Sequence, residues 1–135
     1  MTSSAVLLVP ALVIMATAPL GAGEFATLKE QIATARKALT NMVLYLDKRG
    51  PEQQKQVKET ADAVSAHFAK LKAPAGKAAE FKELKDTWEA FKKTREKDLV
   101  PAILAGEREK YEKIGAGIQK ERLDRMYALI AILEK

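Results

Sequence analysis

Seven apolar residues in the first third of the chain are spaced alternately three and four residues apart. They are Phe25, Leu28, Ile32, Ala35, Leu39, Met42 and Leu46. This spacing places them on one face of a helix, as in a coiled coil, whereas a strand would show a period of two residues. The same spacing returns in two later segments and, interrupted, in a fourth. We therefore predict an all-α protein.

Length and composition agree with this prediction. The chain has 135 residues, which is typical of a single domain, and 47% of them are apolar and 30% charged. There is no cysteine. Disulfide bonds, thiolate metal sites, iron–sulfur clusters and covalently attached c-type haem are therefore excluded.

The formal net charge is +5, and basic proteins often bind nucleic acids or acidic membranes. In this chain, however, lysine and arginine alternate with acidic residues, as in residues 82–86 and 107–110. No basic run is interleaved with aromatic residues that would stack on bases. The pattern is typical of a solvated helix surface, and we expect no nucleic-acid partner.

Residues 5–22 carry no charge and include Pro10, Pro19 and several small residues. The length suits both a signal-peptide core and a short membrane span, although no basic residue precedes it. We therefore assign residues 1–23 to a signal peptide or N-terminal membrane anchor and residues 24–135 to a four-helix bundle. A cleaved signal or a retained anchor predicts a periplasmic or otherwise extracytoplasmic domain. A buried soluble helix is the third alternative.

The first helix is predicted from Glu24 to Arg49, ended by Gly50 in a left-handed conformation. Pro51 then suits the first turn of a second helix that extends to Lys72. Its apolar face comprises Val57, Ala61, Val64, Phe68 and Leu71.

The third helix is predicted to start near Lys77, with Phe81, Leu84, Trp88 and Phe91 on its apolar face. Pro101 is expected to bend or end it, and Gly106 to close one further turn.

The fourth helix is predicted from Glu107 to Glu134. Its apolar positions are Tyr111, Ile114, Ile118, Leu123, Met126, Ile130 and Leu133. The step from Ile118 to Leu123 is five residues, so the register slips just after two glycines. Short connections between long helices predict an antiparallel, up-down-up-down four-helix bundle.

Charged residues interrupt the apolar face of the third helix at Arg95 and Asp98. Buried charges are costly, so they are paired, turned to solvent or functional. Counting from the turn near Gly106 places Arg95 opposite residues 115–117, where glycines leave room. One interpretation is a pocket for a small anionic or polar ligand, formed by Arg95, Asp98, Tyr111 and Arg122. The alternative is that Pro101 rotates the helix and turns Arg95 and Asp98 to water.

The usual catalytic and metal-binding motifs are missing. His67 is the only histidine, the Glu-x-x-His repeat of di-iron bundles is absent, and there is no phosphate-binding glycine loop. No Ser–His–acid arrangement is recognisable. We therefore expect neither an enzyme nor a resident cofactor or metal.

Residues 83–114 read ELKDTWEAFKKTREKDLVPAILAGEREKYEKI. This stretch, with Trp88, Arg95 and the turn at residues 101–106, resembles the extracytoplasmic four-helix-bundle sensor domain of bacterial chemoreceptors. The resemblance implies binding of a small molecule or a binding protein, and a homodimer. That family continues into a second membrane span and a cytoplasmic signalling helix. We therefore expect a stand-alone relative or a fragment.

Size, a hydrophobic leader and bundle topology also resemble the soluble periplasmic b-type four-helix cytochromes. That family holds haem between a methionine at the start of the first helix and a histidine near the end of the fourth. Here those regions offer Phe25 and Arg125-Met126-Tyr127 instead.

Three hypotheses follow. The first is a non-enzymatic, extracytoplasmic, sensor-like bundle that binds a small ligand. The second is a structural or accessory subunit of a membrane-associated complex. The third is a periplasmic metal or haem carrier.

Overall fold

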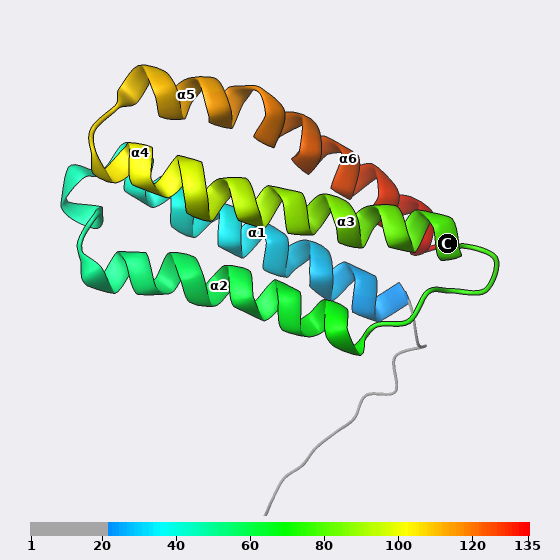
Figure 1. Cartoon of the computed structure of the whole chain (residues 1–135). Coiled ribbons are helices and arrows are strands. Elements are labelled where there is room, and N and C mark those ends of the chain that lie inside the picture. Colours follow the sequence, from blue (N-terminus) through cyan, green and yellow to red (C-terminus); the bar gives the residue numbers. More distant parts are fainter. Residues whose placement is uncertain (1–21) are drawn as a thin grey trace, which may run out of the picture.

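The computed structural model describes residues 22–135, which form an all-helical bundle with four long helical segments (Figure 1). Almost all of the predicted signal peptide or anchor lies outside the described residues. The segments are α1 (Ala22–Leu44), α2 (Pro51–Lys70), α3 (Ala78–Thr94) continuing through η2 (Arg95–Leu99) into α4 (Val100–Leu104), and α5 (Arg108–Ala116) followed by α6 (Ile118–Leu133). Within residues 22–135, no helix combines the length and apolar character that crossing a membrane requires.

The first helix ends five residues earlier than predicted, because the side chain of Arg49 folds back over its C-terminal end. Its Nε donates to the carbonyl oxygen of Met42 at 2.6 Å, and its Nη2 donates to that of Val43 at 3.2 Å. These carbonyls would otherwise lack partners at a helix end. A short 3₁₀ turn, η1 (Leu46–Lys48), follows, and the predicted core residue Leu46 is 80% exposed.

Gly50 does not adopt the predicted left-handed conformation. Its φ of −79° and ψ of 179° are extended, and it precedes Pro51 in the first turn of α2. The positive-φ glycines are Gly76 and Gly106, at 76° and 74°. Gly106 therefore closes the turn after α4, as the sequence predicts. The second helix ends at Lys70, two residues short of the predicted Lys72.

Pro101 does not end the third segment. One wide π-helical turn, η2, precedes it, and the Val100 amide donates to the carbonyl oxygen of Arg95 instead of Glu96. A proline has no amide hydrogen and crowds the carbonyl four residues earlier, so a wider turn relieves both problems. The segment then continues through α4.

The predicted register slip in the fourth segment is a break at Gly117 between α5 and α6. A Cβ atom at Gly117 would lie 2.8 Å from the carbonyl oxygen of Lys113. Ile118, predicted to be in the core, is 45% exposed, and Gln119 is buried at 4% exposure in its place. The break shifts the helical register by one residue, so Ile118 faces outward.

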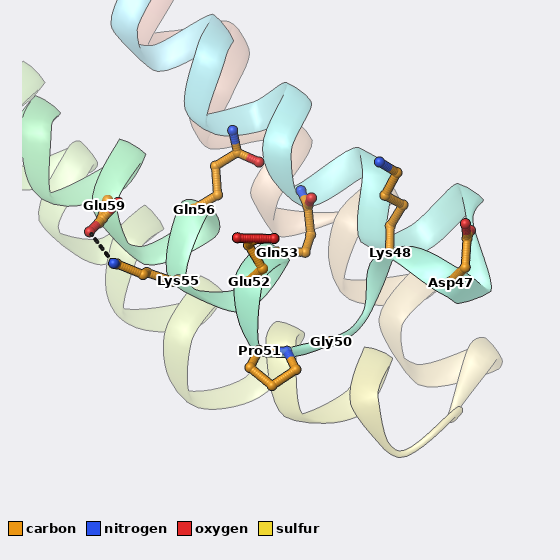
Figure 2. A pocket seen from close by; sticks show the side chains of 9 residues that line it. All are labelled: Asp47, Lys48, Gly50, Pro51, Glu52, Gln53, Lys55, Gln56 and Glu59. Atoms are coloured by element: carbon orange, nitrogen blue, oxygen red, sulfur yellow. Dashed lines mark ion pairs between the residues drawn. The ribbon is translucent and has the colours of Figure 1, made fainter.

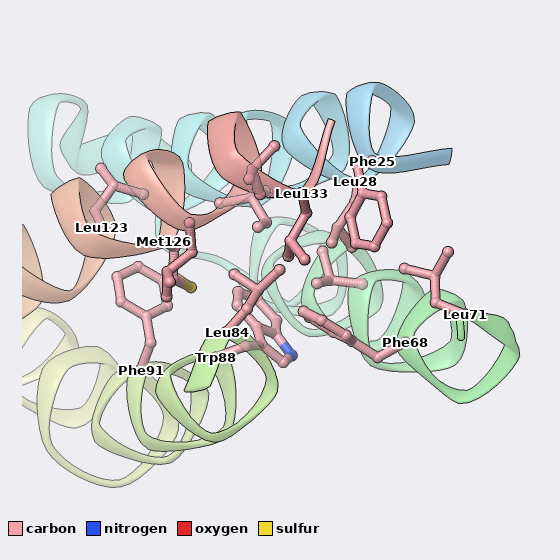
Figure 3. Packing of buried hydrophobic residues seen from close by; sticks show 14 of the residues in the cluster. Phe25, Leu28, Phe68, Leu71, Leu84, Trp88, Phe91, Leu123, Met126 and Leu133 are labelled. Carbon is pink, nitrogen blue, oxygen red and sulfur yellow. The ribbon is translucent and has the colours of Figure 1, made fainter. Parts of the chain in front are cut away.

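Two groups of buried side chains fill the bundle. The larger contains Phe25, Phe68, Leu84, Trp88 and Met126, and Figure 3 shows these side chains meeting between the helices. The Nε1 atom of Trp88 donates to Ser65 Oγ at 3.0 Å. The smaller group lies around Met42, Val57, Leu99, Ile103 and Tyr111. Arg95 lies between the two groups in sequence, after Phe91 of the larger one and before Leu99 of the smaller.

Candidate functional site

Arg95 is fully buried, although it carries a positive charge. Its Nη2 donates to the carbonyl oxygen of Val57 in α2 at 2.9 Å. Its Nε and Nη1 atoms have no hydrogen-bond partner among the described residues. The alternative in which Arg95 turns to water is therefore wrong, because η2 keeps this side chain directed into the bundle.

Two fully buried alanines are Ala35 in α1 and Ala61 in α2. Ala61 is one helical turn after Val57, so it lies close to the carbonyl group that accepts from Arg95 Nη2. Larger side chains on these helices pack above and below this level, in the two buried groups.

Burial lowers the pKa of Arg95 from its ordinary value to about 10, because desolvation penalises the charged form; the nearby Glu96 carboxylate opposes this effect only in part. Glu96 does not form an ion pair with Arg95, and its carboxylate lies 3.9 Å from Lys92 Nζ instead. Arg95 is therefore a charged group at neutral pH, with no acidic partner among the described side chains. A buried charge of this kind favours an acceptor or an anion nearby.

A groove of about 580 Å³ opens between α1 and α5. We call it the α1–α5 groove. Its wall is formed by buried apolar side chains from α1, α3, η2, α5 and α6, namely Leu39, Phe91, Leu99, Tyr111 and Leu123. Its exposed rim carries Arg36, Glu112 and Lys120, and Gly115 lies beside them. This size and mainly apolar lining are typical of small-molecule sites.

The four predicted ligand-binding residues do not converge on one point. Tyr111 lines the α1–α5 groove, but Arg95 does not, although in sequence it falls between two of the wall residues, Phe91 and Leu99. Asp98 is exposed and lines none of the groove, as expected if it faces water. Arg122 lies at the α3–α6 contact, where its Nη1 donates to Thr94 Oγ1 at 2.8 Å and to Gln119 Oε1 at 2.9 Å.

Two residues with structural importance were missed in the sequence. Gln119 is buried, and its Nε2 donates to the carbonyl oxygen of Phe91 at 2.9 Å. Arg49 also donates through Nη1 to the carbonyl oxygen of Ile103 at 3.2 Å, which joins the ends of α1 and α4. The five-residue step after Ile118 was the available signal for Gln119. No sequence pattern marked Arg49.

A second depression lies at the corner between α1 and α2, along residues 47–59 (Figure 2). Its lining side chains are mostly charged or polar and of both signs, and Lys55 Nζ lies 3.9 Å from Glu59 Oε2. The charges are exposed and no buried polar group points into it. We therefore place the candidate site at the α1–α5 groove.

Metal ligands do not cluster in the described part of the chain, where no three His, Cys, Asp or Glu side chains come together in a suitable arrangement. His67 contacts Gln31, with Nδ1 and Oε1 2.8 Å apart. No protein-family model, curated protein or solved structure matches the chain.

Proposed function

We propose that this chain is a non-enzymatic binding module that holds a small ligand in the α1–α5 groove. The observation that carries the proposal is the mainly apolar wall of the groove. In sequence, one buried charge with two unpartnered nitrogen atoms, that of Arg95, falls between the wall residues Phe91 and Leu99. Such a charge lowers the stability of a core, so stability alone does not explain its presence. Functional sites, in contrast, often retain groups that cost stability.

The proposal includes the finer architecture that the sequence suggests. Consecutive helices run up-down-up-down, and the N-terminal segment places the domain outside the cytoplasm as a secreted or anchored protein. The chemoreceptor-like features of residues 83–114 support a sensor-like role, in a homodimer or a larger membrane-associated complex. In such a role, ligand binding changes the position of α5 relative to α1.

Gly115 provides a direct test, because it borders the groove and a Cβ atom there would meet nothing within 4 Å. Nile red, a neutral dye that fluoresces in apolar sites, is titrated into wild type, Gly115→Leu and Gly115→Ala. The leucine side chain should occupy the groove and abolish the fluorescence increase. The alanine variant is the matched control, since it removes the same glycine without filling the groove.

Equal fluorescence increases in all three proteins would contradict the proposal, as would the absence of any increase with wild type. Circular dichroism spectra of the three proteins should be the same, which separates occlusion of the groove from unfolding.

A second candidate function is that of a structural or accessory subunit. Its support is a set of exposed apolar side chains at the ends of α1 and α4 and just after α1, namely Leu44, Leu104, Tyr45 and Leu46, which are 63%, 42%, 51% and 80% exposed. Exposed apolar groups of this kind often contact another protein. A tagged chain crosslinked in its own host should then be recovered in a larger complex, and Leu46→Glu should abolish that complex. Recovery as a monomer would contradict this candidate.

A further inference from the structure

The apolar wall of the α1–α5 groove favours a ligand with a hydrocarbon body. Leu39, Phe91, Leu99 and Leu123 are each 4–9% exposed, so they are packed below the rim and present carbon surfaces to the groove. The groove lies between helices and has walls on both sides, which suits a soluble molecule that enters it. A flat bilayer surface does not fit such a concave site.

The rim favours a negatively charged end on that ligand. Arg36 makes no ion pair with any described residue. Lys120 Nζ lies 2.8 Å from Asp124 Oδ2, an exposed pair that water screens strongly. The one acidic rim residue, Glu112, forms the same kind of exposed pair with Arg108, whose Nε lies 2.9 Å from Glu112 Oε2, so two cations stand against one carboxylate at the rim. The rim therefore carries more available positive than negative charge.

The buried guanidinium of Arg95 adds to the same preference. It lies one helical turn from both Phe91 and Leu99 in sequence, is fully buried and has no acidic partner among the described side chains. Its charge and the cations at the rim have the same sign. A cationic ligand would be repelled by both.

We propose that the groove binds a soluble medium-chain carboxylate, with its hydrocarbon chain against Leu39, Phe91 and Leu99 and its carboxylate held by Arg36 and Lys120. This inference rests on the proposed function, since it names the class of ligand for the same groove. It assigns Arg36 and Lys120, which the sequence analysis did not single out, as the residues that determine specificity.

Isothermal titration calorimetry of the full-length protein with octanoate, 1-octanol and octyltrimethylammonium tests the charge preference, because the three ligands share the same octyl chain. Octanoate should bind about five- to tenfold more tightly than 1-octanol, which is the size of effect expected for two exposed charge contacts. Raising the salt concentration from about 20 mM to about 0.5 M should weaken octanoate binding and leave 1-octanol binding unchanged.

The double variant Arg36→Gln, Lys120→Gln should reduce octanoate affinity to that of 1-octanol. The matched control is Lys70→Gln, Lys85→Gln, which removes the same total charge at exposed positions outside the groove and should bind octanoate as wild type does. A loss of octanoate binding in both double variants would show a general charge effect and overturn the inference.

The remaining outcomes separate the inference from the proposed function. Equal affinity for octanoate and 1-octanol, tighter binding of the ammonium compound, or binding only to vesicles of anionic lipid would overturn the inference and leave a ligand-binding groove in place. Failure of all three octyl compounds, together with no difference between wild type and Gly115→Leu in the Nile red titration, would overturn both.

Discussion

The Nη2 atom of Arg95 donates a hydrogen bond to the main-chain carbonyl oxygen of Val57 across 2.9 Å, which joins the third helical segment to α2 inside the bundle. This single contact leaves Nε and Nη1 without partners. The bundle therefore holds a charge that its own side chains do not neutralise. In sequence this charge falls one helical turn from Phe91 and from Leu99, two residues that line the α1–α5 groove.

Replacing the charge by an apolar side chain of similar length should stabilise the fold. We expect Arg95→Met to raise the free energy of unfolding by about 1–3 kcal/mol, because an uncompensated buried charge is removed and the space is filled. Urea denaturation monitored by circular dichroism measures this. The control is Lys97→Met at an exposed position nearby, which should stay within about 0.5 kcal/mol of wild type. A less stable Arg95→Met protein would show that an unseen partner already neutralises the charge.

The buried charge of Arg95 also predicts that the stability of the protein depends on pH. Folding lowers the pKa of Arg95 from its ordinary value to about 10, because burial penalises the charged form, so the unfolded chain binds more protons above pH 10. The stability of wild type relative to Arg95→Met should therefore be constant below about pH 9 and should rise as the pH increases through 10. Comparing the two proteins cancels the titration of the lysines and tyrosines. A constant difference up to about pH 11 would contradict the assignment.

Arg49 should be essential for the junction of α1 with α4. Arg49→Lys keeps the charge but cannot donate to Met42, Val43 and Ile103 together, because an ammonium group lacks the planar, branched shape. We expect the free energy of unfolding to fall by about 1.5–3 kcal/mol, as for hydrogen bonds to a charged group. Thermal and urea denaturation measure this loss. The control is Lys48→Met, which removes an exposed cation in the adjacent 3₁₀ turn. Equal stability of the two variants would argue against this role.

Two glycines in the fourth segment should respond in opposite directions to the same substitution. Gly115→Ala should raise the free energy of unfolding by about 0.5–1 kcal/mol, because Gly115 is helical and a Cβ atom there meets no neighbour. Gly117→Ala should lower it by about 1 kcal/mol or more, since its Cβ atom would approach the carbonyl oxygen of Lys113 to 2.8 Å. The midpoints of urea denaturation of the two variants, each compared with wild type, measure these changes in stability. If both variants changed in the same direction, the helix break would not lie at Gly117.

The number of helices and most of the core were predictable because they depend on local spacing. Six of the seven residues in the first apolar series are buried, and so are all five on the face of α2. Leu46 is the exception, because its position depends on Arg49, which ends α1 through contacts made by a side chain seven residues beyond Met42. Periodicity gives no information on such a contact.

The candidate site was predictable only in part. The interruption at Arg95 and the slip before Leu123 fall within the segments that line the proposed groove. They left open whether Asp98 faces solvent, and they did not indicate that Arg122 would contact Thr94 or that Arg36 and Lys120 would flank the groove. Those relationships depend on how four helices pack, and the sequence alone does not specify the rotation of each helix.

By itself, the sequence determined an all-helical chain with four apolar faces, because the side chains that repeat every 3.5 residues must be buried together. Only the tertiary structure decided what happens where that repeat fails. The π-helical turn at residues 95–99 keeps Arg95 inside, and the break at Gly117 turns Ile118 outward and Gln119 inward. Both are single-residue changes of helical register, and their direction is set by the neighbouring helices against which each side chain must pack.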